Sequence, residues 1–264
     1  MFPAIQIFHL HITGYLICTI IGIAAACIPS VLAYKKRGGD DISMIFVYIS
    51  AAVGVLIGSH LLFGITNIRL WGSIFEQESF LKGLLRFGDI FSGSVFYGGL
   101  LGGMLAGMIS IKAQKLEASL VTDCMAFAAP LFHGFGRIGC FCTGCCFGVE
   151  SEYGIVLNYS SVEEANGVPR VPVQLYEAAF VFVIAAVLAV MLKKGLMKGK
   201  LFQIYLLAYS VGRFILEFWR GDEYRGFLFG LSTSQNISIV VFAVTSVLFI
   251  FSPQKQREQE RKDI

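Results

Sequence analysis

Seven long apolar segments, separated by shorter polar ones, dominate the pattern along this chain. An apolar segment needs about 20 residues to cross the roughly 30 Å hydrocarbon layer of a bilayer as a helix. We therefore predict an all-α integral membrane protein with about seven transmembrane helices. They are predicted at approximately residues 9–34, 42–66, 90–111, 120–136, 174–192, 201–219 and 236–251.

Composition supports a membrane protein. Hydrophobic residues make up 56% of the 264 residues, charged residues only 15%, and the mean hydropathy is +0.71. A soluble domain has about 45–50% apolar residues, so this chain requires lipid as its solvent. The net charge of +3 is spread over short connecting segments and indicates no nucleic-acid partner. Because the first lysine, Lys35, follows the first apolar segment, we expect no cleaved signal peptide.

The segments predict a single transmembrane domain, residues 1–252, followed by a cytoplasmic tail at 253–264. We find no internal repeat of about 20–50 residues, which gives no support to a solenoid or an inverted-repeat transporter. The two longest connections, 67–89 and 137–173, are predicted to form a small cap outside the cytoplasm. Within the second, the stretch "EYGIVLNYSS" has the β-branched and aromatic residues of a short strand or hairpin.

Basic residues predict the orientation, because lysine and arginine are retained on the cytoplasmic side of a membrane. Alternate connections and the C-terminal tail carry 13 basic residues on one side, and the other side carries 7. The N-terminus is therefore predicted outside the cell and the C-terminus in the cytoplasm.

Three charged residues lie within the sixth apolar segment or at its end. Arg213, Glu217 and Arg220 have the spacing i, i+4 and i+7, which predicts one face of a helix. Charged groups are costly in lipid and normally face a cavity or a partner, so this stripe predicts a polar cavity. The alternative is that Arg213 and Glu217 neutralise each other while Arg220 reaches the membrane surface.

A second cationic position lies at the predicted outward end of the fourth segment. Arg137 is surrounded there by Gly134, Gly136 and Gly139. Glycines let a ligand approach the main chain, and the planar guanidinium group suits phosphate. The stretch is a candidate phosphate receptor, although a helix end with an interfacial arginine would have the same composition.

The start of the fifth segment, "RVPVQLYEAAF", carries further polar side chains. Gln174, Tyr176 and Glu177 fall in the first turns of the predicted helix. Glu177 near the positive end of a helix has a purely structural explanation. The stretch fits an interfacial cap and the wall of a binding site equally well.

Glycines recur at four-residue intervals in the third segment, at Gly99, Gly103 and Gly107. This spacing brings helix backbones together and predicts a packing face. Tyr97 lies just before it, where its hydroxyl group could serve the cavity or bond to the backbone.

Four stretches, in order, resemble the prolipoprotein diacylglyceryl transferase family. "GRIGCFCTGCCFG" is similar to the family's G-R-x-G-N-F-x-N-G-E-x-x-G, and "VFYGGLLGG" to its S-F-H-G-G-L-I-G. "VPVQLYEAAF" is similar to H-P-S-Q-L-Y-E, and "GRFILEFWR" to R-x-x-x-E-F-x-R. The resemblance spans most of the chain. It implies an enzyme of the bacterial inner or cytoplasmic membrane.

The family moves a diacylglyceryl group from phosphatidylglycerol to the lipobox cysteine thiol of a prolipoprotein signal peptide and releases glycerol phosphate. By resemblance, Arg137 would hold the phosphate, Arg213 would assist its displacement, and no cofactor is implied. The catalytic residues implied are Arg137, Arg213 and Tyr97. The substrate-binding residues implied are Arg137, Gly139, Gly98, Gly99, Gln174, Tyr176, Glu177, Glu217 and Arg220.

Several positions depart from the family pattern. Tyr97 stands where the family has a histidine, and tyrosine, with a reference pKa near 10, is a poor base at neutral pH. Val171 replaces another histidine, while Cys140, Thr143 and Cys145 replace two asparagines and a glutamate. The general base is therefore unassigned. Transfer to a different acceptor, or a non-catalytic protein that binds anionic phospholipid, remain alternatives; transport of a soluble anion has the least support.

Cysteines cluster in the arginine motif, where Cys140, Cys142, Cys145 and Cys146 fall within seven positions. They are compatible with small buried hydrophobic residues, with a disulfide outside the cell, or with a metal site or reactive thiol. Their spacing does not separate these possibilities, and we predict no metal site. His60 and His133, in apolar segments, are interpreted as structural residues.

Overall fold

The computed structural model describes residues 5–7, 10–76, 79–93, 95–158, 160, 162–221, 227–228 and 230–251. Within these residues the chain is mainly helical, and six helices are long and apolar enough to cross a membrane. A shorter apolar helix covers Gly98–Ala113. The predicted all-α membrane fold is confirmed. The tail predicted at 253–264 lies outside the described residues.

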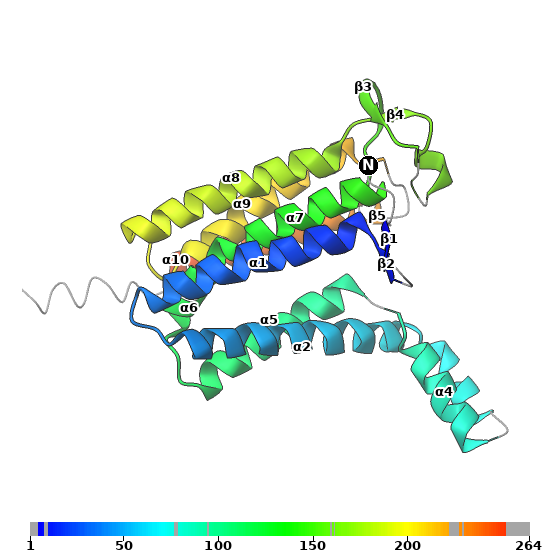
Figure 1. Cartoon of the computed structure of the whole chain (residues 1–264), viewed down its shortest axis with the longest axis horizontal. Coiled ribbons are helices and arrows are strands. Elements are labelled where there is room, and N and C mark those ends of the chain that lie inside the picture. Colours follow the sequence, from blue (N-terminus) through cyan, green and yellow to red (C-terminus); the bar gives the residue numbers. More distant parts are fainter. Residues whose placement is uncertain are drawn as a thin grey trace, which may run out of the picture. The chain divides into compact units, whose positions relative to one another are not determined.

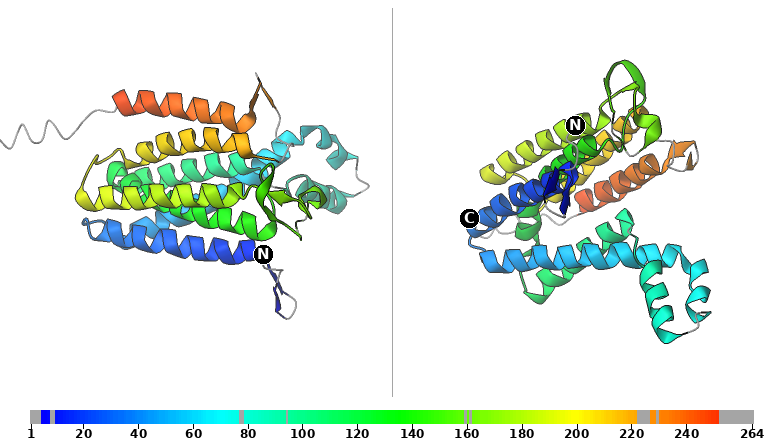
Figure 2. Two further views of the ribbon diagram at one scale, coloured as in Figure 1. Left: turned by 90° about the horizontal axis from the view of Figure 1, so that it is seen from above. Right: turned by 45° about the vertical axis from the view of Figure 1, so that its right-hand side comes forward.

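The chain divides into two compact units, residues 1–30 with 122–264 and residues 31–121. In the first unit, α7 packs against α8, α8 against α9, and α9 against α10. Figures 1 and 2 show α7, α8 and α9 running side by side. The helices in this unit, two of which cross its boundaries, are α1 (Gly14–Lys35), α6 (Ala118–Ala126), α7 (Ala128–Thr143), α8 (Val173–Lys194), α9 (Leu201–Leu216) and α10 (Thr233–Phe251).

Three two-stranded antiparallel sheets and two 3₁₀ turns, η2 (Glu163–Ala165) and η3 (Glu217–Trp219), complete this unit. The strands are β1 (Ile5–Ile7), β2 (Leu10–Ile12), β3 (Glu150–Val156), β4 (Pro169–Arg170), β5 (Phe227–Leu228) and β6 (Leu231–Ser232). β3 pairs with β4, which confirms the strand predicted from "EYGIVLNYSS". A small apolar core of Phe147, Leu157 and Ala165 lies beneath them.

The second unit contains η1 (Ile68–Leu70) and helices α2 (Asp41–Thr66), α3 (Gly72–Phe75), α4 (Phe80–Ile90) and α5 (Phe96–Ala113). The connection predicted at 67–89 is therefore built largely of short helices. Ser79 begins α4 by accepting a hydrogen bond from the backbone N–H of Lys82. Apolar residues such as Phe80 and Leu81 are exposed on α4, as is typical of a helix that contacts lipid.

Helices α2 and α5 approach each other through glycines. A Cβ atom at Gly102 would overlap the carbonyl group of Gly54, and one at Gly98 would overlap that of Gly58. The packing face predicted for this helix is confirmed, but its closest approach lies one residue earlier than the predicted series. Gly99 instead lies against Val55. Gly103 of the predicted series also packs on α2, where a Cβ atom would lie 2.6 Å from Val55 Cγ2, so the two glycine series with the same spacing share this face.

Replacing Gly102 with alanine is expected to reduce the free energy of unfolding by about 1–3 kcal/mol, because the added methyl group must push two backbones apart. Gly107→Ala, on the same helix, is the matched control, since a Cβ there would lie 3.8 Å from Ala51 Cβ. Denaturant titration of the protein in detergent measures both variants. Equal stability of the two would contradict the packing seen between α2 and α5.

Candidate functional site

A buried ion pair joins α7 to α8. Arg137 Nε lies 3.0 Å from Glu177 Oε2, and His133 Nε2 lies 3.4 Å from Glu177 Oε1. Tyr209 of α9 donates a hydrogen bond of 2.9 Å to Glu177 Oε1. Gly134 permits this approach, since a Cβ atom there would overlap the ring of Phe182 on α8. Three helices therefore meet around one carboxylate.

The environment of Glu177 requires these partners. Its side chain is 0% exposed, whereas that of Arg137 is 17% exposed. An isolated carboxylate is strongly disfavoured in such a setting, so the guanidinium group and the tyrosine hydroxyl group stabilise its charged form. The contacts of Arg137 use Nε, which also donates to His133 Nε2 at 3.2 Å. Within the described chain, its two terminal nitrogens are therefore available to a ligand.

A second ion pair lies at the end of α9. Arg213 Nη2 is 2.6 Å from Glu217 Oε2 and donates a 3.0 Å hydrogen bond to Ser234 Oγ. Ser232 Oγ donates to Glu217 Oε1 at 2.8 Å. Arg213 Nη1 is buried and has no hydrogen-bond partner among the residues that the structure describes. A donor held in this way is suited to an anionic ligand.

The predicted stripe of three residues is only partly correct. α9 ends at Leu216, Glu217 begins the 3₁₀ turn η3, and Arg220 has an extended backbone with φ −77° and ψ 135°. Arg220 forms an isolated β-bridge with Gly148, so it leaves the helical face of Arg213. The backbone of Arg220 bonds to that of Gly148, and the helix does not continue to this residue.

The two ion pairs lie close enough to interact electrostatically. Glu177 is influenced by the charges of both Arg137 and Arg213, which come from different helices. The two arginines and the two glutamates are formally neutral together, but each guanidinium group keeps nitrogens that its glutamate does not engage. These donors favour an anion.

Arg137 was predicted at the end of its helix, but it lies inside α7. The helix continues to Thr143 and ends at Gly144, whose φ of 76° is the left-handed conformation typical of a helix C-cap. Close packing explains why the helix continues through its glycines. A Cβ atom at Gly139 would lie 2.9 Å from Tyr15 Cδ2 of α1.

The other predicted site residues have varied settings. Gln174 is 1% exposed and donates a 2.7 Å hydrogen bond to the carbonyl oxygen of Cys145, which fixes the chain after α7. Tyr176 is 54% exposed and does not share this buried setting. Gly98 and Gly99 belong to the other unit and contact α2, while the side chain of Tyr97 lies outside the described part of the chain. Substrate contacts of these residues stay predictions.

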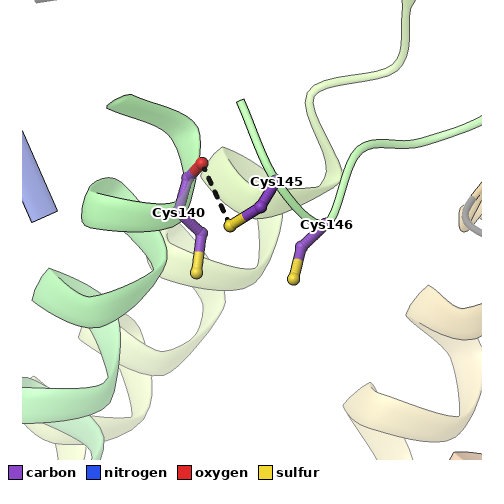
Figure 3. Close-up of side chains that lie close together, drawn as sticks. All are labelled: Cys140, Cys145 and Cys146. Carbon is purple, nitrogen blue, oxygen red and sulfur yellow. Dashed lines mark hydrogen bonds between the residues drawn. The ribbon is translucent and has the colours of Figure 1, made fainter. Parts of the chain in front are cut away.

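Three cysteines meet where α7 ends. Gly144 and Cys146 both have positive φ, 76° and 61°, and reverse the chain so that Cys145 and Cys146 return towards Cys140. The three Sγ atoms lie within 4.8 Å of one another, and Figure 3 shows the side chains gathered at the helix end. All seven cysteines of the chain are free thiols. The neighbouring thiols and the guanidinium group of Arg220 lower the pKa of Cys146 below its ordinary value.

Comparison with known proteins identifies the family. The sequence model of prolipoprotein diacylglyceryl transferase matches residues 3–251. The chain belongs to the prolipoprotein diacylglyceryl transferase family. A phosphatidylglycerol–prolipoprotein diacylglyceryl transferase of Clostridium tetani is 33% identical over 256 residues, which cover 96% of this chain and 98% of the relative. A second, from Clostridium perfringens, is 32% identical over 256 residues, 96% of each chain. The one from Geobacter sulfurreducens is 31% identical over 245 residues, 89% of this chain and 88% of its own.

This member of the transferase family contains site residues that sequence reasoning missed. His133 was interpreted as a structural residue, yet it contacts Glu177, and Tyr209 was not singled out. A signal was available: His133 precedes Arg137 by four residues, and Tyr209 precedes Arg213 by four, the spacing of neighbours on a helix face. Ser232 and Ser234 gave no such signal, because only the fold brings β6 to Glu217 and α10 to Arg213.

Proposed function

We propose that this chain transfers a diacylglyceryl group from phosphatidylglycerol to the lipobox cysteine thiol of a prolipoprotein. The reaction takes place in a bacterial cytoplasmic membrane, with the N-terminus outside the cell. The observation that carries the proposal is the two buried arginine–glutamate pairs, whose guanidinium groups keep nitrogens that the glutamates do not engage, in a chain that matches the transferase family over nearly its full length.

The chemistry is a displacement at carbon. The acceptor thiolate forms a carbon–sulfur bond to the glycerol carbon that bears the phosphate, and the carbon–oxygen bond breaks. The electron pair leaves with the phosphate as glycerol phosphate, so the departing group carries negative charge. Preorganised cationic donors in a setting with little water stabilise such charge most effectively.

The roles of the two arginines follow from their free nitrogens. The terminal nitrogens of Arg137 hold the lipid phosphate while Nε stays on Glu177. Nη1 of Arg213 donates to the phosphate as the carbon–oxygen bond breaks, while Nη2 stays on Glu217. The two glutamates thus position the guanidinium groups, and neither needs to contact the lipid.

The assay uses the full-length protein in detergent with labelled phosphatidylglycerol and a peptide that contains a lipobox cysteine. We expect a thioether product whose formation requires the cysteine, with a serine-containing peptide as the matched control. No product from the cysteine peptide, while another family enzyme is active in the same mixture, would refute the proposal. Retained phosphatidylglycerol binding in that case would identify a lipid-binding protein without transferase chemistry.

A further inference from the structure

The cysteine cluster at the end of α7 has the composition of a metal site. Cys140, Cys145 and Cys146 each offer one sulfur atom, all within 4.8 Å of one another. Tetrahedral zinc–sulfur bonds of about 2.3 Å place bound sulfurs roughly 3.8 Å apart. Small side-chain movements would therefore bring the three sulfurs to one ion.

The backbone is shaped to hold this arrangement. Cys146 is one of only three non-glycine residues with positive φ in the described chain, an unfavourable conformation for a residue with a side chain. Gln174 holds the same segment through its hydrogen bond to the Cys145 carbonyl oxygen. The fourth cysteine of the motif, Cys142, points elsewhere: its Cβ lies against Gly14 of α1.

We infer that Cys140, Cys145 and Cys146 bind a zinc-class divalent ion whose open fourth position takes the acceptor thiol. The second part of this inference rests on the proposed function. Thiolate ligands select borderline-soft ions such as zinc, and three protein ligands with an open position are typical of catalytic zinc sites. The three cysteines are partly exposed, so a substrate sulfur can reach the ion.

Charge balance agrees with this site. Three thiolates and one divalent ion carry a net charge of −1, and Arg220, whose guanidinium group lies beside the Cys146 thiol, carries +1. Cys140 lies in α7 three residues beyond Arg137, and Cys145 and Cys146 follow the end of that helix, where Gln174 bonds to the Cys145 carbonyl oxygen. An ion here would stand next to the proposed phosphate receptor.

The ion would supply a means of making the acceptor thiolate, a role for which the sequence assigns no base. Binding of the acceptor thiol to the ion releases its proton to water and leaves a metal-bound thiolate. That sulfur forms the carbon–sulfur bond, and the electron pair of the broken carbon–oxygen bond leaves on glycerol phosphate. The thioether product is a weaker ligand than a thiolate and departs. No oxidant or reductant is needed.

The metal alone tests the site. Full-length protein in detergent, reduced and then dialysed against zinc, is expected to retain about one ion per chain by elemental mass spectrometry. Cys140→Ser, Cys145→Ser and Cys146→Ser should each weaken zinc affinity by more than about 100-fold, whereas Cys142→Ser should not. Wild-type retention no greater than that of the variants would overturn the site. So would a disulfide between two of the three cysteines in protein alkylated directly in membranes.

Cobalt substitution tests the fourth position. Addition of a lipobox peptide should change the thiolate-to-cobalt absorption bands, and the matched serine peptide should not. Unchanged bands in a protein that binds the ion would overturn the role of the ion in binding the acceptor. Because these readouts do not require product, ion binding without thioether formation would count against the proposed transferase and not against the metal site.

Discussion

Replacing Arg137 with alanine is expected to lower the rate of diacylglyceryl transfer by roughly 100- to 1000-fold, the usual effect of removing one preorganised donor to a developing anion. Arg137 is the only arginine of α7, and its terminal nitrogens are the part of the buried pair available to a lipid phosphate. Arg137→Lys keeps the charge but loses the forked donor, so an intermediate loss is expected. Initial rates with labelled phosphatidylglycerol measure both variants.

Loss of folding must be separated from loss of catalysis. Arg137→Gln alone leaves the buried Glu177 carboxylate without its cation, which costs about 3–5 kcal/mol of stability. The double variant Arg137→Gln with Glu177→Gln removes both charges and is expected to recover most of that stability while staying inactive. Thermal unfolding and turnover are measured on the same samples. Recovery of activity in the double variant would show that Arg137 serves the fold and not the lipid phosphate.

The membrane helices could be predicted because their length and apolar character are local properties. The helix predicted at 174–192 is α8, Val173–Lys194, and the one predicted at 236–251 is α10, Thr233–Phe251. The predicted end of the fourth segment, at Gly136, was seven residues short. Glycine costs about 1 kcal/mol in a helix, and packing of Gly134 against Phe182 offsets that cost. This packing depends on the tertiary structure, and the sequence alone does not reveal it.

The site could be predicted in part. Arg137, Glu177, Arg213 and Glu217 were all singled out because charged residues in apolar segments are costly and therefore specific. One of the two pairings was also suggested: the sequence indicated that Arg213 and Glu217 could pair, but gave no sign that Arg137 pairs with Glu177. The cysteine cluster depends on the left-handed conformation of Cys146, a backbone feature that residue spacing does not encode.

Exchanging the two members of the second pair is expected to give a folded but nearly inactive protein. In the double variant Arg213→Glu with Glu217→Arg, the charges and composition are unchanged, and the exchanged side chains keep the i, i+4 spacing at which the wild-type pair forms. Ser232 and Ser234 can each donate or accept a hydrogen bond, so both can serve the exchanged partners. The guanidinium group, however, moves about 6 Å along the helix axis.

That displacement removes Nη1 from the position where we place the departing phosphate, and misplacement by about 1 Å can already reduce rates by roughly 100-fold. Turnover is therefore expected to fall by at least about 100-fold while the unfolding temperature changes little. Glu217→Gln is the matched control, because it keeps Arg213 in place and removes only the countercharge. If the exchanged variant turns over as fast as the wild type, the position of Arg213 is not used in catalysis, and the pair is a structural bridge between α9 and α10.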